Sequence, residues 1–415
     1  MTREFENMLR LFGCGALGKE PAAAWCENLR IVRSLAQRQQ IWPVVYSAVL
    51  KKLKSGEILL PGEIKSSLEA EYTLNIAKNM QRTEFNRAAL KELSGAGVEC
   101  CILKGSTLAE LYALPETRIS SDTDALIDPS DEQKAIDVLK GLGYNVVLRE
   151  KRDYEIKATH KVGGLLELHV GLMYKSSDDI IFENCISFKE PRIKKEDGTY
   201  TLGINDALLF TAAHFIKHFV RNGAGIRQVM DLLLYMKKYE DKADWQRFNT
   251  VMEKLRYDFL INAVKSIGVG YWGMEFKDFT PVDTKITDAL LTDIENGGVF
   301  GKDEKDRMAA YNFFAKKRKN MTDGEYEKYR LNNPELPFLK KLFPEPNYVK
   351  KVYPWAGKNI VLLIFAYIKR YFSVAGGLIS GKRNLQKTIY GETQKTPTEQ
   401  TKKRIELMQA LDIID

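Results

Sequence analysis

The chain has 415 residues, of which 44% are hydrophobic and 28% are charged. This balance excludes a disordered chain, which has too few apolar residues to form a core, and a membrane-embedded bundle, which carries far fewer charges. The length predicts two or three domains, or one mixed core with helical flanks, and the net charge of +8 is concentrated in one part of the chain.

Residues 1–95 are predicted to form an N-terminal helical region, because apolar residues recur at spacings of three and four between Trp42 and Leu50. Acidic residues interrupt the first twenty positions, which is not typical of a secretory signal. The five cysteines are odd in number, and Cys100 and Cys101 lie in an apolar run, where they are interpreted as small buried hydrophobic residues. We therefore expect a cytoplasmic protein without a disulfide framework.

Residues 96–202 are predicted to form the core of an α+β fold. A glycine-rich turn leads into a first apolar strand, and strands and helices then alternate. The expected elements are strands at 98–103, 121–127, 144–148, 154–158 and 164–170 and helices at 107–113 and 131–142. This order predicts a mixed sheet with helices packed on it.

Residues 203–390 are predicted to form a second helical region, and residues 391–415 a polar C-terminal tail. Residues 301–415 hold 23 Lys and Arg against 13 Asp and Glu, so the basic excess of the chain lies here. It fits an anionic partner, such as nucleic acid, a lipid surface or an anionic substrate, or a merely solvated surface. The apolar run 360–368 is far shorter than the roughly 20 residues that span a bilayer, so we expect no transmembrane segment.

The strongest indication of function is the pair Asp122 and Asp124. At positions i and i+2 of a strand, the two side chains project from the same face. Like charges at this spacing repel unless a cation lies between them, and Mg²⁺ (or Mn²⁺) is the usual cation where phosphates are handled. Two surface aspartates at the end of a strand would give the same pattern.

Two further features point to the same chemistry. Glu167 stands in an otherwise apolar strand, where an acid is costly to bury without a partner, and it is a candidate third metal ligand. Lys104, Gly105 and Ser106 lie between the end of a strand and the start of a helix. Backbone N–H groups at such a place favour an anion such as a triphosphate, and a glycine permits its close approach.

These parts occur in the order found in the nucleotidyltransferase superfamily that includes DNA polymerase beta. In closer detail the chain resembles a bacterial family of uncharacterised nucleotidyltransferases, often encoded near polysaccharide-biosynthesis genes. The resemblance covers most of residues 40–370 and lies at 102–105, 108–109, 111–112, Arg118, Asp122, Asp124, 135–144, 167–169, 214–218, 226–232 and 342–354. The family commonly has aliphatic residues where this chain has Thr123 and Ala125, both on the strand face opposite the carboxylates.

The resemblance implies an Mg²⁺-dependent nucleotidyltransferase. It would transfer a nucleoside monophosphate from an NTP to a hydroxyl group of a small molecule, sugar, protein or RNA end, with release of pyrophosphate. Asp122, Asp124 and Glu167 would be the catalytic residues and the metal ligands.

Nucleotide binding is expected from the residues around this site. Lys104, Ser106 and Arg118 would contact the phosphates, although a surface position or a helix cap would explain each of them taken alone. Together with Gly105 they form the expected phosphate-binding part of the nucleotide site.

All four histidines lie within residues 160–218. His169 and His214 are expected either to bind the nucleotide through hydrogen bonds or to be ordinary histidines of the fold, since no cysteine or acid stands at a spacing that supports zinc. Asp231, with Arg227 one turn before it, is either an active-site acid or base at the nucleotide or half of an i, i+4 ion pair.

Two other functions fit the sequence. The protein would be a catalytically silent nucleotide-binding or regulatory module, or a toxin–antitoxin-type enzyme that modifies tRNA or a protein. The basic C-terminal residues fit an RNA partner, but the sequence contains no RNP-like motif. The presence of all three acids on predicted strands favours an active enzyme.

Overall fold

The computed structural model of the chain describes residues 1–149, 154–172, 181–182, 185–298, 304–322, 353–357, 359–379 and 398–415, with the single residues Glu325, Pro346 and Val349. Two compact units are formed, one by Met1–Met308 with Glu406–Asp415 and the other by Ala309–Ile405. The first unit contains the sheet and all the site residues expected from the sequence. The boundaries at residues 95 and 202 stay a prediction.

The described strands form one mixed sheet with the order β3–β4–β5–β2–β1–β7–β6. They are β1 (Cys101–Ile102), β2 (Asp122–Leu126), β3 (Asn145–Val147), β4 (Glu155–His160), β5 (Gly164–His169), β6 (Ile193–Lys194) and β7 (Tyr200–Thr201). The pairs β2–β5 and β1–β7 are parallel, whereas the other neighbours are antiparallel. This topology confirms the predicted mixed sheet and the α+β class.

Two strands at one side of the sheet, β6 at its edge and β7 next to it, were not predicted from the sequence. β6 and β7 have two residues each, too few to show the alternating pattern by which a strand is recognised. β1 is also shorter than the predicted run 98–103, because only Cys101 and Ile102 pair with both neighbouring strands.

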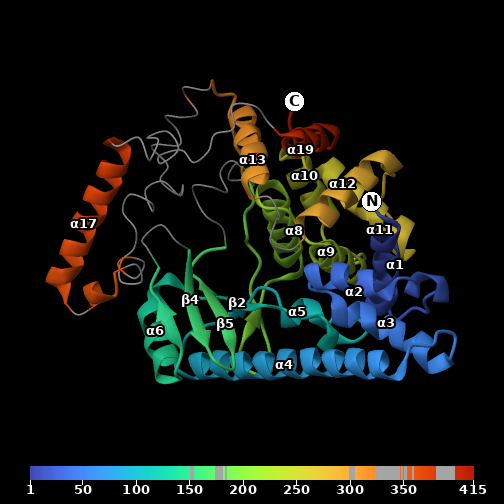
Figure 1. The fold of residues 1–415 in the computed structure, drawn as a ribbon, viewed down its shortest axis with the longest axis horizontal. Helices are drawn as coiled ribbons and strands as arrows, with labels where there is room; N and C mark the ends of the chain where they lie inside the picture. The colour runs from blue at the N-terminus through green and yellow to red at the C-terminus, as the bar shows by residue number, and fades with distance from the viewer. Residues whose placement is uncertain are drawn as a thin grey trace. The chain divides into compact units, whose positions relative to one another are not determined.

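One face of the sheet is covered by α4 (Gly62–Gly95) and α6 (Glu132–Gly141) (Figure 1). The interface is an apolar core to which every layer contributes, including Leu90 and Leu93 of α4, Ile136 and Leu139 of α6, and Leu166 and Leu168 of β5. The long helix α4 therefore supplies one wall of the domain that carries the sheet.

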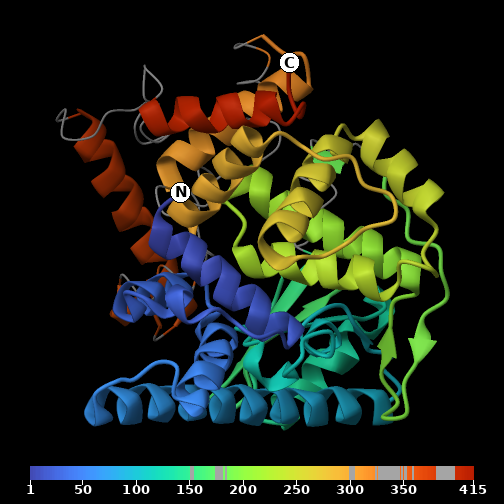
Figure 2. The same ribbon diagram turned by 90° about the vertical axis from the view of Figure 1, so that its right-hand side faces the viewer.

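The opposite face meets α8 (Ile204–Arg221), and α9 (Ile226–Lys238) packs beside α8 (Figure 2). The apolar contacts on this face are fewer and centre on Leu103, Leu126 and Phe210. The space that they leave between the strands and the helices contains the charged residues described below.

The two helical flanks predicted from the sequence meet in the first unit. Helix α1 (Arg3–Leu17) packs against α3 (Trp42–Ser55) and α11 (Asp258–Trp272). The indole N–H of Trp272 donates to the carbonyl oxygen of Leu9 at 3.0 Å. A Cβ atom at Gly13 would lie 2.2 Å from the Trp272 ring, so the glycine allows this close approach. Helices α2 (Leu29–Arg38), α10 (Trp245–Lys254) and α12 (Thr284–Gly297) complete this helical part.

The described α-helices that follow α12 are α13 (Glu304–Arg318), α17 (Ile360–Ile379) and α19 (Glu399–Ala410). Part of the expected polar tail is thus helical, and Leu407 and Met408 on it are buried. In the part of the chain that the structure describes, no helix is long and apolar enough to cross a membrane. Much of the basic stretch, including 326–345 and 380–397, lies outside the described residues, so its anionic partner stays a prediction.

Candidate active site

The carboxylates of Asp122 and Asp124 lie on the face of β2 that faces α8. Strand alternation sends Thr123 to the other face, where its hydroxyl oxygen accepts a hydrogen bond of 2.9 Å from Asn86 of α4. Asp124 is 1% exposed and Asp122 is half-buried. The two acids predicted from the D-x-D spacing therefore share one largely enclosed surface.

Asp124 has two potential co-ligands on the neighbouring strand β5. Glu167 stands directly opposite Asp124 in the parallel register, and the His169 ring nitrogen Nε2 lies 3.1 Å from Asp124 Oδ1. One ligand atom from each of these three residues lies within 4.8 Å of the others. Burial and the nearby carboxylates of Glu155 and Asp124 raise the pKa of Glu167. A cation at this point would relieve that repulsion.

Asp122 stands beside this cluster on the same side of β2. Its Oδ1 accepts hydrogen bonds from the hydroxyl groups of Ser120 at 3.0 Å and Ser121 at 3.4 Å. The compact group of potential ligands among the described residues thus contains His169, which the sequence placed with the nucleotide-binding residues. It does not contain Asp122, which the sequence placed with the metal ligands.

Lys104 lies between the two aspartates. Its ammonium nitrogen is 3.3 Å from Asp124 Oδ2 and 3.8 Å from Asp122 Oδ2. Burial lowers the pKa of Lys104, but the carboxylates of Asp124, Asp122 and Glu167 outweigh burial and raise it. The side chain is therefore a charged ammonium group at neutral pH.

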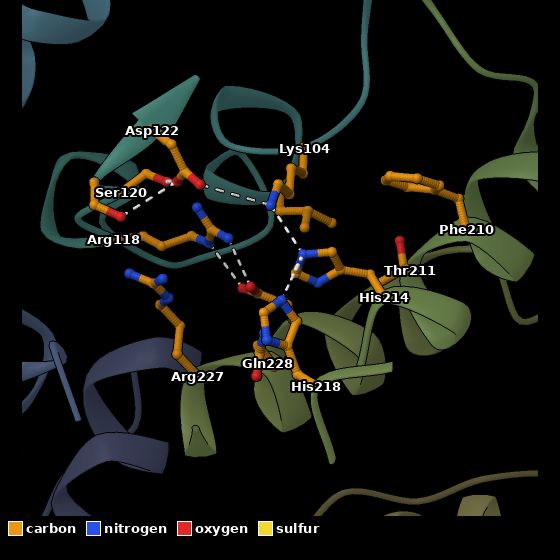
Figure 3. A pocket seen from close by; sticks show the side chains of 13 residues that line it. Lys104, Arg118, Ser120, Asp122, Phe210, Thr211, His214, His218, Arg227 and Gln228 are labelled. Carbon is orange, nitrogen blue, oxygen red and sulfur yellow. Dashed lines mark hydrogen bonds and ion pairs between the residues drawn. The ribbon is translucent and has the colours of Figure 1, made fainter. Parts of the chain in front are cut away.

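A pair of histidines on α8 completes the surroundings of Lys104 (Figure 3). His214 Nε2 is 2.9 Å from the Lys104 nitrogen and 3.2 Å from His218 Nε2. An ammonium group can only donate, so His214 Nε2 accepts from Lys104. Burial and the charge of Lys104 hold the pKa of His214 well below its usual range and lower the pKa of His218 to about 3. Both rings are neutral.

Asp231 on α9 forms a buried ion pair with Arg118. The guanidinium donates two parallel hydrogen bonds of 2.7 and 2.6 Å to the carboxylate, and the Tyr112 hydroxyl donates a third at 2.8 Å. Arg227, the partner that the sequence also allowed, donates instead to the carbonyl oxygen of Ile119. The i, i+4 alternative for Asp231 was therefore wrong about the partner, which comes from a loop far away in the sequence.

The same arginine supports the predicted phosphate-binding loop. The third nitrogen of Arg118 donates to the carbonyl oxygen of Gly105 at 3.2 Å. Gly105 has a φ of +81°, a conformation that favours glycine, and a Cβ atom there would meet nothing within 4 Å. Arg118 thus fixes the loop from Lys104 to Ser106 through the Gly105 carbonyl group, while the space beside the Gly105 Cα atom is open. Ser106 begins the short helix α5 (Ser106–Ala109).

Three pockets meet at Asp122. The first lies between the loop and helices α8 and α9 and is lined by Lys104, Arg118 and His214 (Figure 3). The second contains the possible metal ligands together with Tyr154, Glu155 and Lys217. The third lies toward α4 and is lined by Arg82, Gly105 and Ser106. Cavities therefore reach Asp122 from different sides.

Some residues of this site were not found from the sequence. His218 stands one turn after His214, so its proximity was visible from the spacing, but its hydrogen bond to His214 was not assigned. Tyr112 lies in the stretch 111–112 that carries the resemblance, but its hydrogen bond to Asp231 was not assigned. Arg82 was not singled out, because it reaches the site only through the packing of α4.

A mixed sheet that presents two carboxylates on one strand, an acid opposite them on the parallel neighbour and a glycine loop beside them is the arrangement of a nucleotidyltransferase. Comparison with known families agrees: residues 27–260 match the family described as uncharacterised nucleotidyltransferase, and the chain belongs to this family. The match ends at residue 260. The stretch 342–354 is therefore linked to the family only by the sequence resemblance described above. Neither the curated proteins nor the solved structures gave a match.

Proposed function

We propose that this protein transfers a nucleoside monophosphate from an NTP to a hydroxyl group of an acceptor, with Mg²⁺ or Mn²⁺ as its cofactor and pyrophosphate as the second product. The observation that carries the proposal is the carboxylate pair of β2 next to Glu167 of β5, at a point where three pockets meet. A cytoplasmic location, where NTPs are abundant, belongs to the same proposal.

The residues present fit a divalent cation. Among the described residues, the buried atoms Asp124 Oδ2 and His169 Nδ1 have no hydrogen-bond partner, although the Lys104 ammonium nitrogen stands 3.3 Å from Asp124 Oδ2. Asp122, Asp124 and Glu167 would hold the cation, with His169 as a further candidate ligand. A cation bound there would supply charge neutralisation at the phosphates and activation of the attacking hydroxyl group. Because one candidate ligand is an imidazole, the set suits Mn²⁺ at least as well as Mg²⁺.

Glu167 is the residue best suited to take the proton of the acceptor. The hydroxyl oxygen forms a bond to the α-phosphorus, and its proton passes to the Glu167 carboxylate. The bond between the α-phosphorus and the bridging oxygen breaks, and its electron pair leaves with pyrophosphate. The raised pKa of Glu167 supports this role, because a base with a higher pKa holds a proton better during the transfer.

The triphosphate is assigned to the loop from Lys104 to Ser106. The open space above Gly105 and the guanidinium of Arg82 in the adjoining pocket both favour an anion there. Arg118 and Asp231 use their polar atoms on each other and on Gly105. We therefore assign them to the support of the loop, in place of the direct nucleotide contact expected from the sequence.

A thermal-shift measurement tests nucleotide binding. The wild type and the Asp122→Asn/Asp124→Asn variant are compared with each of the four NTPs, with and without Mg²⁺ or Mn²⁺. A ligand at 100 times its Kd adds about 2.7 kcal/mol to the free energy of unfolding, and we expect this shift only for the wild type with metal. A response of neither protein to any nucleotide would contradict the proposal.

Transfer is tested separately with α-³²P-labelled NTP and fractions of small molecules, RNA and protein as acceptors. We expect label on one fraction and an equal amount of pyrophosphate. The Glu167→Gln variant should lose about 100-fold in turnover while its NTP affinity stays near that of the wild type. Metal-dependent binding without label transfer would instead support the silent binding module.

A further inference from the structure

The position that a cation should occupy beside Asp124 is approached by a side chain of the protein itself. The Lys104 ammonium group lies within 4 Å of one carboxylate oxygen of Asp124 and one of Asp122. It is largely enclosed, with 18% of its side chain exposed. An ammonium group and a divalent cation cannot both contact the same carboxylate oxygen atoms closely, because the two positive charges repel at such a distance.

We propose that Lys104 is the resident counter-ion of the Asp122–Asp124 pair and competes with the metal for these carboxylates. The inference rests on the proposed function, since it assumes that a cation binds there. Without metal, Lys104 neutralises the two acids and allows Asp124 to be buried. When a cation enters, the ammonium group gives up its carboxylate contacts.

The histidines of α8 provide the second partner that such a displacement needs. His214 Nε2 accepts a hydrogen bond of 2.9 Å from Lys104, and His218 Nε2 lies 3.2 Å from the same nitrogen atom. Both rings are neutral, so they do not repel the ammonium group. His214 is therefore a positioning residue that keeps Lys104 at the edge of the site after the carboxylates take up a metal.

This edge is also the boundary between two pockets. Lys104 and His214 line both the pocket that contains Asp124 and Glu167 and the pocket bounded by Arg118 and Gln228. An ammonium group displaced from the carboxylates stays in reach of an anion in either pocket. When a metal binds, the ammonium group of Lys104 thus becomes available to contact the phosphates.

The test measures the Kd of Mn²⁺ for the full chain without nucleotide, from the electron paramagnetic resonance signal of unbound Mn²⁺. In the Lys104→Gln variant the competing charge is gone, and we expect the Kd to fall by about ten-fold, as for other close charge pairs withdrawn from solvent. Lys104→Arg keeps the charge and should stay near the wild type. Lys217→Gln is the matched control, because Lys217 lines the same pocket but donates to the Tyr154 hydroxyl.

An equal or higher Kd in Lys104→Gln than in the wild type would overturn the inference and leave the metal site in place. An equal fall in Lys217→Gln would overturn it too, since any lost charge would then suffice. If none of the proteins bound Mn²⁺, the metal site of the proposed function would fail, and the inference with it. The failure of the inference alone is therefore recognisable.

A second measurement needs only the wild type and so does not depend on how a variant folds. The protein is treated with acetic anhydride with and without Mn²⁺, and acetylation of each lysine is followed by mass spectrometry. We expect Mn²⁺ to increase acetylation of Lys104, which loses its contacts with Asp122 and Asp124, and to leave Lys217 unchanged, because Lys217 donates to the Tyr154 hydroxyl. Unchanged or decreased acetylation of Lys104 would overturn the inference.

Discussion

The two faces of the sheet are made by alternate residues of the same strands, yet one face is apolar and the other carries charged side chains. On the side of α4 and α6, Ala125, Leu166 and Leu168 are fully buried among apolar side chains. On the side of α8, the residues next to them, Asp124 and Glu167, bring two carboxylates close together. Burial of each large apolar side chain contributes about 1.5–3 kcal/mol. One face thus provides stability that allows the other to hold repelling charges.

The largest expected effect is on catalysis, from Asp124→Asn on the charged face. We expect turnover to fall by about 10³-fold, because the variant loses the carboxylate at the centre of the ligand cluster. Thr123→Val changes the adjacent residue on the other face and is the control, with turnover near that of the wild type. Similar losses of turnover in both variants would show that the two faces are not separable.

The next effect concerns the support of the loop. Asp231→Ala leaves the buried guanidinium of Arg118 without its ion-pair partner, so we expect urea unfolding to show a loss of about 3 kcal/mol in the free energy of unfolding. The double variant Arg118→Met/Asp231→Leu should recover most of this stability without recovering turnover, because Gly105 still lacks its donor. Recovery of turnover with stability would contradict a positioning role for the pair.

On the apolar face, Leu166→Ala should cost about 2 kcal/mol or more in the free energy of unfolding, since it leaves a cavity beneath β5. Turnover per folded molecule should not change. Urea unfolding and assays at a temperature where the variant is fully folded check both statements. A loss of turnover in the folded variant would mean that packing under β5 sets the position of Glu167 on its other face.

The smallest effect is a pH dependence that belongs to the charged face. The pKa of His218 is lowered to about 3 in the folded protein, against about 6.5 for an ordinary histidine. The unfolded chain therefore binds the proton first, and folding stability falls as the pH drops below about 6.5 toward 3. When the pH is lowered from 7.5 to 5.5, the free energy of unfolding, measured with urea, should fall by about 1 kcal/mol less in His218→Asn than in the wild type. An equal loss in both proteins would contradict the neutral state of the ring.

Local patterns were enough for the elements that carry the chemistry. The amphipathic helix at 131–142 and the strand at 121–127 correspond to α6 and β2, because each has a clear period of its own and is ended by glycine, proline or charged residues. The shared face of Asp122 and Asp124 followed from strand alternation alone. The interpretation of Cys100 as a small buried residue is confirmed as well.

Contacts across long stretches of sequence could not be predicted in the same way. Arg118 reaches Asp231 across a separation of 113 residues, and the sequence offered Arg227 because it stands nearby on the same helix. Lys104 reaches His214 across 110 residues. These contacts depend on how α8 and α9 pack over the sheet, which no local period encodes.

The sequence by itself determined which residue types lie on which face of each strand, since alternation along a strand is a property of the backbone. The order of its motifs also indicated the nucleotidyltransferase family, which the match over residues 27–260 confirms. Only the tertiary structure decided that His169 joins Asp124 and Glu167, that Asp231 holds Arg118 and that Lys104 stands between the two aspartates. The reason is that a charged side chain finds its partner through the packing of whole elements, and in this protein the partners stand as far as 113 residues apart in the sequence.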